Sequence, residues 1–391
     1  MASTTFVDRE TLIEASWLND VNAVVYTPGT QTAADIANVP AGSIAATDVQ
    51  AALNELDTEK QPLDSTLTAI SDETIGSFSH RNKIINGKME IAQRGTSFAP
   101  TPGYTLDRWV VNTNGGGGVV TVSQQADAPA NNEFQNSLRA TVTTADTSIA
   151  AGDFGQIIQP IEGFNVRDLI GRTFTLSFWV RSSKTGIHCV RFGNSAGDRS
   201  YVAEYTINAA NTWEFKTVTV SGGLITAGTW NWTNGSGLDV RFALATGSTF
   251  QTTAGSWQTG NFLATANQVN VLDTIDNVFA ITGVQLEVGS VATPFEQRPI
   301  GTELALCQRY ARVMRVSVGF SAAASNSVGS CTVSYAMRAA PTVTAISTAL
   351  ATNVANHLYE DISETGLRTT VVATAAGDTY SVRDVLLTVE L

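Results

Sequence analysis

The chain is short of charge and cysteine for its length. Only 15% of its 391 residues are charged, so Thr, Ser, Asn and Gln must cover much of the surface. The three cysteines are odd in number and widely spaced, which fits neither a disulfide framework nor a zinc pattern. We therefore expect Cys189, Cys307 and Cys331 to be buried thiols made in a reducing cytoplasm.

Several motifs are also absent. No apolar run approaches the roughly 18 residues of a membrane span, so no membrane insertion is expected. The N-terminus has no basic segment followed by an apolar one, so we expect no signal peptide. The P-loop, the G-x-G-x-x-G fingerprint and H-E-x-x-H are missing, and no cofactor or metal is predicted.

Acidic charge is concentrated in the first 79 residues. They hold twelve acidic and two basic side chains, and so carry −10 of the net charge of −12. Binding of nucleic acid needs basic stripes, so nucleic acid is not expected as a partner. We interpret the acidity as solubility, with a basic docking partner as the alternative. Gly and aromatic residues become frequent beyond residue 86, which predicts a boundary near residues 76–83.

Two helical patterns occupy this acidic segment. Thr11 and Glu14 have the spacing of a capping box. The apolar residues after them recur on one helical face, and the Trp among them must be buried against the arm or a partner. These residues are Ile13, Trp17, Val21 and Val24.

The second pattern is a heptad repeat over residues 49–70. Thr47-Asp48-Val49-Gln50 again has capping-box spacing, and Pro62 divides the pattern into two short helices. Short helices are marginal alone in water, so a parallel homotrimer is expected to bury their seam, with an intramolecular hairpin as the alternative. The two apolar rows consist of Val49, Leu56, Leu63 and Ile70, and of Leu53 and Leu67 with Lys60 as a polar intruder.

Beyond residue 84 the apolar pattern changes from helical to alternating. Strands with one buried face are predicted at 174–180, 213–219, 238–244 and 278–288, separated by Gly-rich turns. Many strands without βαβ alternation predict a mainly β fold, an antiparallel jelly-roll-like β-sandwich. A smaller C-terminal β domain should follow, and a short helical N-terminal arm should precede the sandwich.

The C-terminal region allows two interpretations at its start. Residues 302–315 have helical spacing, but residues 308–313 could also continue a strand. Strands are predicted at 332–335, 342–346, 369–372 and 385–391. Because the chain ends in an apolar strand, we expect the end to be buried, for example against neighbouring chains.

Several segments resemble tail fibres of bacterial viruses. Residues Ile85–Gly95 and Tyr104–Trp109 are similar to the opening of carbohydrate-binding-module-like domains in such fibres. Phe174–Val180 is similar to their central strand, and Thr282–Gly289 with Thr293–Pro299 to their closing segment. Ala37–Gly42 and Val49–Asn54 resemble shaft segments of tail fibres. Phe6–Asp8 and Ala15–Asn22 resemble the virion-attachment end of podovirus-type fibres.

The resemblance implies a trimeric fibre of the virion. It implies tail attachment by residues 1–40, a short helical stalk at 41–79, a carbohydrate-binding-module-like sandwich at 80–300 and a tip domain at 301–391. Its partners would be tail adaptor or nozzle proteins and host surface polysaccharide or lipopolysaccharide. The candidate attachment residues are Phe6, Ile13, Trp17, Leu18 and Val21.

Sugar rings stack on exposed aromatic side chains, with polar groups that fix their orientation. Trp230 and Trp232 share one face beside a Gly-rich turn, and Trp257 lies among small polar residues. These three are the candidate glycan contacts in the sandwich, with cover for the end of the core as the alternative. His357 and Tyr359 are candidate contacts at the tip, with ordinary packing as the alternative.

Enzyme signals are weak. Gly193–Gly197 matches G-x-S-x-G, but a strand rather than a helix should follow it, so we predict a hairpin loop. Asp273 and Asp276 are read as turn residues, with a structural calcium site as the alternative. The sequence thus predicts a protein that is not an enzyme. A purely structural spacer and a polysaccharide-degrading tailspike stay open as alternatives.

Overall fold

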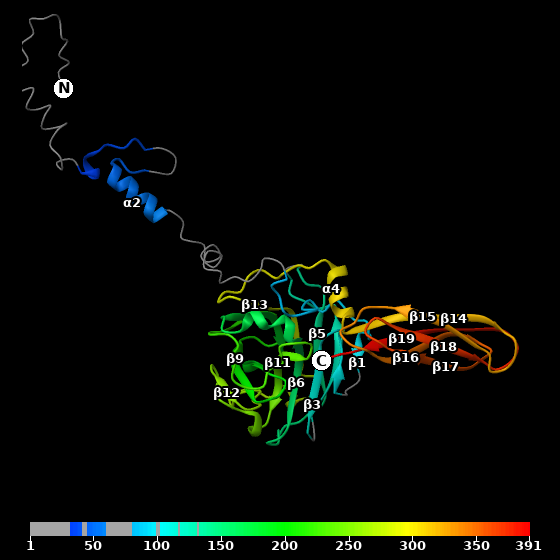
Figure 1. The fold of residues 1–391 in the computed structure, drawn as a ribbon. Helices are drawn as coiled ribbons and strands as arrows, with labels where there is room; N and C mark the ends of the chain where they lie inside the picture. Colours follow the sequence, from blue (N-terminus) through cyan, green and yellow to red (C-terminus); the bar gives the residue numbers. More distant parts are fainter. Residues whose placement is uncertain (1–31, 41–44, 60–79, 99–101, 116–117, 131–132) are drawn as a thin grey trace, which may run out of the picture. The chain divides into compact units, whose positions relative to one another are not determined.

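The computed structural model describes residues 32–40, 45–59, 80–98, 102–115, 118–130 and 133–391. The chain divides into two compact units, Met1–Glu73 and Thr74–Leu391. Strands dominate the second unit, in which the described helices are few and short (Figure 1). The domain limits expected from the sequence inside these units stay predictions.

In the first unit a loop folds back onto one helix. The 3-10 helix η1 spans Ala33–Asp35, and α2 spans Val49–Glu59. The backbone N–H of Ala51 donates to Asp48 Oδ1 at 2.7 Å, so Asp48 caps α2, not Thr47 as the capping-box spacing predicted. The helix ends before Pro62, and the second predicted helix lies outside the described residues.

Two antiparallel sheets form a sandwich in the second unit. The six-stranded sheet has the order β1-β4-β5-β13-β7-β10, and the seven-stranded sheet the order β12-β9-β8-β11-β6-β3-β2. The strands of the first sheet are β1 (Ser97–Phe98), β4 (Val119–Gln125), β5 (Ser137–Thr144), β13 (Val278–Val288), β7 (Phe174–Ser182) and β10 (Glu214–Val220). Those of the second are β12 (Trp257–Thr259), β9 (Arg199–Ile207), β8 (Gly186–Gly193), β11 (Ser236–Thr246), β6 (Phe154–Glu162), β3 (Val110–Asn114) and β2 (Gly103–Tyr104).

The strand order confirms a jelly roll. Strands β5, β6, β7 and β8 alternate between the two sheets, so the chain passes from one sheet to the other at each of these connections. The later strands β11 and β13 then enter the middle of one sheet each, β11 between β6 and β8 and β13 between β5 and β7. Two such interleaved halves are the jelly-roll arrangement predicted from the alternating pattern.

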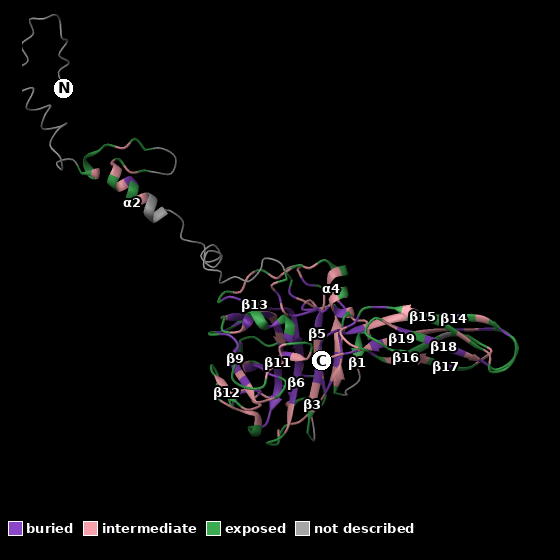
Figure 2. Ribbon diagram, viewed as in Figure 1, coloured by how far each residue is buried: buried purple, intermediate pink, exposed green. Residues whose placement is uncertain are grey.

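The core lies between the sheets, and the apolar residues of β7 and β11 alternate toward it as predicted. Most of the residues between them are buried as well, so the prediction of a single buried face was wrong for these two strands. In β10 the buried side chains are Val218 and Val220, whereas Phe215 is 47% exposed. Phe178 of β7 and Phe242 of β11 are fully buried, with ring centroids 5.0 Å apart in an edge-to-face arrangement. Trp109 is also fully buried. Buried residues line the sandwich strands, whereas the C-terminal strands carry more exposed positions (Figure 2).

Short 3-10 helices lie in the connections between the sandwich strands: η2 (Gly163–Asn165), η3 (Arg167–Leu169), η4 (Ser248–Phe250) and η5 (Val271–Asp273).

The C-terminal region starts with a helix and continues with a strand, so each of the two interpretations holds for part of it. Helix α4 (Ile300–Gln308) is followed after two residues by β14. Two antiparallel sheets of three strands follow, with orders β14-β19-β16 and β15-β18-β17. Their strands are β14 (Ala311–Ala322), β15 (Val328–Ser334), β16 (Thr342–Thr352), β17 (Val354–Glu360), β18 (Gly366–Ala373) and β19 (Gly377–Thr388).

Buried charges join these sheets to the sandwich. The Glu390 carboxylate contacts the guanidinium groups of both Arg94 and Arg108, and the Arg108 guanidinium lies 3.6 Å from the centre of the Tyr310 ring. Tyr104 donates its hydroxyl proton to the backbone oxygen of Leu391 at 2.7 Å. Glu390 and Leu391 are therefore bonded to the sandwich of their own chain, and the apolar Val385, Leu387 and Val389 are buried in the C-terminal module. Burial against neighbouring chains stays a prediction.

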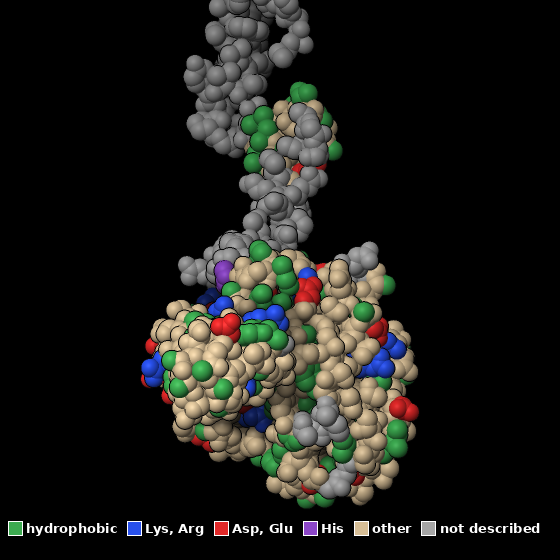
Figure 3. Space-filling view, turned by 90° about the vertical axis from the view of Figure 1, so that its right-hand side faces the viewer, with side chains coloured by type: hydrophobic (Ala, Val, Ile, Leu, Met, Phe, Trp, Pro, Cys, Tyr) green, Lys and Arg blue, Asp and Glu red, His purple; other side chains and the backbone are tan. Residues whose placement is uncertain are grey.

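The surface is poor in charge, as the composition predicts. On the face seen in Figure 3, uncharged polar atoms and backbone dominate, and acidic and basic side chains are scattered. Among the described residues, no helix is long and apolar enough to cross a membrane.

Candidate functional site

The structure brings together the three tryptophans that the sequence singled out in the sandwich. Trp230 and Trp232 are stacked, with ring centroids 5.3 Å apart and planes 15° from parallel. Trp257 meets Trp230 edge to face at 5.8 Å, and Tyr201 meets Trp257 at 5.7 Å. All four are partly buried and pack against the main core. Tyr201, Trp257, Trp230 and Trp232 are called the aromatic row below.

Backbone hydrogen bonds hold the row in place. The indole N–H of Trp230 donates to Ala227 O at 2.9 Å, and that of Trp257 to Gly223 O at 3.0 Å. Asn231 lies between Trp230 and Trp232 in the sequence. Its Oδ1 accepts hydrogen bonds from the backbone N–H groups of Thr233 and Gly235. The ring orientations are thus fixed without a ligand, which lowers the entropy cost of binding one.

The turn between β8 and β9 is hydrogen-bonded to the loop that carries Trp230 and Trp232. The Asp198 carboxylate accepts from Thr229 N at 3.0 and 3.1 Å, and Asn194 donates to Thr229 O at 2.9 Å. Hydrogen bonds from Asn194 and then from Thr229 hold the pKa of Asp198 below its usual value. The buried Arg191 donates to the carbonyls of Asn194 and Arg199 at the ends of the turn. The G-x-S-x-G string is therefore a hairpin turn, as predicted.

Two residues that the sequence reasoning missed extend the row. Arg167 Nε donates to Trp232 O at 2.7 Å, and its guanidinium lies 5.3 Å from the ring centre of Phe164. Phe164 is 50% exposed, and its N–H donates to Thr233 O at 2.9 Å. Both residues follow strand β6 in a turn, where no periodicity marks them. No sequence pattern predicts a site in this segment.

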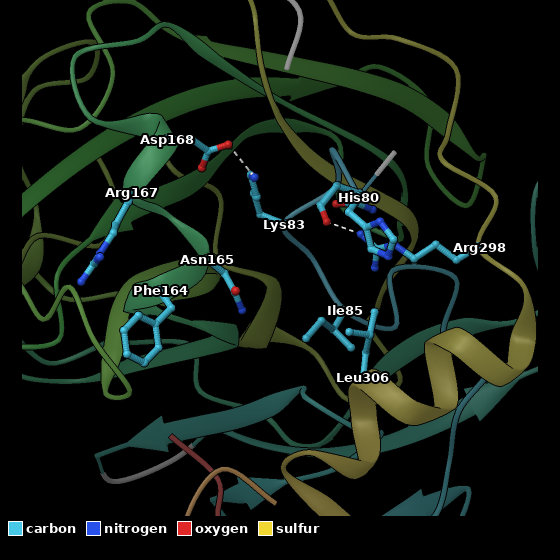
Figure 4. A pocket seen from close by; sticks show the side chains of 10 residues that line it. His80, Lys83, Ile85, Phe164, Asn165, Arg167, Asp168, Arg298 and Leu306 are labelled. Atoms are coloured by element: carbon cyan, nitrogen blue, oxygen red, sulfur yellow. Dashed lines mark hydrogen bonds and ion pairs between the residues drawn. The ribbon is translucent and has the colours of Figure 1, made fainter. Parts of the chain in front are cut away.

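A cavity of about 340 Å³ adjoins this end of the row (Figure 4). Phe164 and Arg167 line one side of it, and His80, Lys83 and Arg298 line others. Lys83 Nζ lies 2.6 Å from Asp168 Oδ2. In Figure 4 the Arg167 side chain extends away from this ion pair, on the same side of the cavity as the Phe164 ring. The volume is in the range of small-ligand pockets.

The candidate tip contacts lie elsewhere, on β17, and are not brought to the aromatic row. His357 is buried between the C-terminal sheets, with Nδ1 2.9 Å from Ser381 Oγ and Nε2 in contact with Thr369 Oγ1. Burial, and then the charge of Arg383, lower its pKa. Tyr359 packs on His357, with ring centroids 5.1 Å apart. These contacts are those of packing, so a ligand would reach His357 only after rearrangement.

Most of the predicted attachment and stalk residues lie outside the described residues. These are Phe6, Ile13, Trp17, Leu18, Val21, Leu63, Leu67 and Ile70. Val49, Leu53 and Leu56 lie on α2. Leu53 is 53% exposed there, so part of the predicted seam is open within one chain.

The two aspartates considered for calcium are turn residues. Asp273 Oδ2 contacts Lys184 Nζ at 2.6 Å, and its Oδ1 accepts from Thr274 and Asn277 at 2.9 Å each. Asp276 adopts a positive φ of 66° in the same loop. Within the described ranges, no group of three or more His, Cys, Asp or Glu side chains is arranged to hold a metal.

Comparisons with known proteins give fold-level likeness at low similarity. No family model matches the chain, and no curated protein matches it. The enzymatically active domain of bacteriophage CBA120 tailspike protein 4 is 18% identical, with a TM-score of 0.31 over 53% of this chain and 21% of that one. TmCBM61 in complex with β-1,4-galactotriose is 11% identical, with a TM-score of 0.25 over 53% and 97%. The family 11 carbohydrate-binding module of Clostridium thermocellum in complex with a mixed-linked tetrasaccharide is 11% identical, with a TM-score of 0.29 over 51% and 98%.

This chain therefore spans about a fifth of the tailspike structure. Because all of these TM-scores are low, the jelly-roll assignment rests on the strand order, and the site rests on its own geometry.

Proposed function

We propose that this chain binds glycans through the aromatic row, as a non-enzymatic fibre subunit of a bacterial virus tail. The observation that carries the proposal is the convergence of Trp230, Trp232 and Trp257 on one partly exposed row. Sugar rings present C–H faces that pack on such rings, and neighbouring polar groups then select among sugars. The polar groups beside this row are Asn231, Arg167 and Arg199.

The rigidity of the row suits binding. The indole N–H groups of Trp230 and Trp257 are bonded to the backbone, and the rings of all three tryptophans stay partly exposed, as stacking of a sugar requires. Rings that are held in place before binding lose little entropy when a sugar packs on them.

The fibre role is supported by the N-terminal resemblance and by apolar surface left open in a single chain. The edge strand β16 pairs only with β19, and its Ile346 and Leu350 are 51% and 48% exposed. Long exposed edge strands invite pairing with another chain. Together with Leu53 on α2, this open apolar surface is consistent with self-association, which we take to be a parallel homotrimer. Docking of its N-terminus onto tail adaptor or nozzle proteins rests on the sequence resemblance.

The experiment measures binding of the labelled intact protein to bacterial cells and to an array of bacterial surface polysaccharides. Trp232→Ala removes the end of the row, and we expect a loss of tenfold or more in affinity, the usual effect of an aromatic hot spot. Trp179→Ala is the matched control, because Trp179 packs on Phe215, with ring centroids 5.5 Å apart, on the outer face of the six-stranded sheet. Its affinity should stay unchanged.

The triple variant Trp230→Ala, Trp232→Ala, Trp257→Ala should bind no glycan. Circular dichroism of the triple variant reports whether the sandwich is intact. Unchanged binding by an intact triple variant would remove the assignment. In the same samples, release of oligosaccharides from a bound polysaccharide would contradict the non-enzymatic part of the proposal.

A further inference from the structure

We infer that the glycan bound by the aromatic row is acidic, and that Arg167 binds its carboxylate or phosphate. The inference rests on the proposed function and adds the chemical class of the ligand. It starts from the position of Arg167, which is exposed, next to Trp232 and on the wall of the neighbouring cavity.

The Arg167 guanidinium is held in place but keeps N–H groups that can bind a ligand. Its Nε is bonded to Trp232 O, and its plane lies beside the Phe164 ring. In the described part of the chain, neither Nη atom has a hydrogen-bond or ion-pair partner. These two atoms are one edge of the planar fork that binds carboxylate or phosphate, and an immobilised fork loses little entropy on binding.

The nearby carboxylates are committed to other partners. Asp168, the next residue, pairs with Lys83 at 2.6 Å across the cavity. Asp198 at the other end of the row accepts from Thr229 and Asn194. Arg167 is thus a cation beside the row whose charge no described carboxylate neutralises. Such a position attracts an anionic ligand over a neutral one.

The cavity provides room for the rest of an acidic residue. The other two cationic groups on its wall are occupied: Lys83 by Asp168, and Arg298 by Glu296 and Glu303 at 3.1 and 3.3 Å. The charges of Lys83 and Arg298 are therefore already neutralised by carboxylates of the same chain. A sugar packed on Trp232 with its anionic group at Arg167 would therefore extend towards a polar pocket of about 340 Å³.

The test compares glycan binding by the intact protein and three variants. The probes are bacterial polysaccharides on an array, some with uronic acids, some with phosphate groups and some neutral. We expect the wild-type chain to bind acidic members. Arg167→Gln should weaken that binding by roughly ten- to a hundredfold, the effect of losing a charge-assisted pair. Arg167→Lys should recover part of it, because a point charge replaces the fork.

Arg315→Gln is the control for net charge, since Arg315 is exposed on β14 and pairs with Asp384. It should bind like the wild type. Carboxyl reduction of a bound uronic polysaccharide, or enzymatic removal of phosphate from a bound phosphorylated one, then identifies which anion is recognised.

Equal binding to acidic and neutral polysaccharides, unaffected by Arg167→Gln, would overturn the inference. If Trp232→Ala still abolished that binding, the proposed function would stand without it. Binding to neutral polysaccharides alone would likewise overturn the inference and leave the proposed function in place. Absence of binding to any polysaccharide would overturn both.

Discussion

The ion pair network at Glu390 offers the sharpest test of how the C-terminal sheets are held. Glu390 is 8% exposed at its side chain and faces Arg94 and Arg108, whose side chains are 8% and 1% exposed. Glu390→Gln would leave two buried guanidinium groups without their shared carboxylate. Removing one partner of a buried pair costs about 3–5 kcal/mol.

The lower end of that range is expected here. Arg108 keeps a hydrogen bond to Pro160 O at 2.6 Å and its contact with the Tyr310 ring, and Asp107 lies 3.9 Å from Arg94. We therefore expect a loss of about 3 kcal/mol in the free energy that holds the C-terminal module folded and docked. Asp107 and Arg108, adjacent in the sequence, thus act through different partners: Asp107 accepts from Gln93, and Arg108 contacts Glu390.

The assay is urea unfolding followed by hydrogen exchange of the β19 amides, because a chain of this size need not unfold in one step. Arg315→Gln breaks an exposed pair in the same module and should leave protection unchanged. The double variant Arg108→Leu, Glu390→Leu should recover part of the stability, since only Arg94 then lacks the Glu390 carboxylate and Asp107 still lies 3.9 Å from it. A loss below about 1 kcal/mol for Glu390→Gln would refute the reasoning.

Two further predictions follow from the site and the helix. The pKa of Asp198 is lowered in the folded chain. Its contribution to the free energy of unfolding is therefore fully present above the ordinary pKa of 3.8 and is lost as the pH falls through the pKa of the folded chain. Tryptophan fluorescence should therefore stay constant from pH 7 to about pH 4 and change below it, whereas Asp198→Asn should show the changed spectrum already at pH 7; identical profiles would contradict this. Light scattering on the intact chain should give three times the chain mass of 41.3 kDa, and Leu53→Lys should lower that mass; a monomeric wild-type chain would exclude the trimer.

Much of the fold could be predicted because alternation and turn residues are local signals. The strands around Phe178 and Phe242 were visible as period-two patterns, and their alternating apolar residues lie in the core. The residues between them are mostly buried too, which the alternation did not predict. The start of α2 was predicted within one residue, but the capping side chain was not. Asp48 and Thr47 are both good caps, and only the backbone geometry selects between them.

The site was predicted in part, for a different reason. Trp230 and Trp232 are two residues apart, so their shared face follows from the strand-like pattern alone. Trp257 reaches them only because β12 pairs with β9 at the edge of the seven-stranded sheet, which is a property of the topology. Phe164 and Arg167 sit on a turn between two sheets, and no local signal marks them.

The chain end illustrates what an apolar pattern can tell. The apolar residues at 385–391 correctly indicated burial, because exposed apolar strands are costly. They could not indicate which surface covers them. Val385, Leu387 and Val389 pack on Tyr335, Leu367 and other residues of the C-terminal sheets, whereas Tyr104 and Arg108 of the sandwich contact the Leu391 carbonyl and the Glu390 carboxylate.

The central claim is that glycan binds on the aromatic row, and oxidation of tryptophan under a bound polysaccharide tests it most directly. The intact protein is oxidised with and without a polysaccharide from the array, and mass spectrometry quantifies the oxidation of each tryptophan. We predict that the polysaccharide protects Trp230, Trp232 and Trp257 and leaves Trp179 on the opposite sheet unprotected. Equal oxidation of the row with and without a bound polysaccharide would contradict the claim.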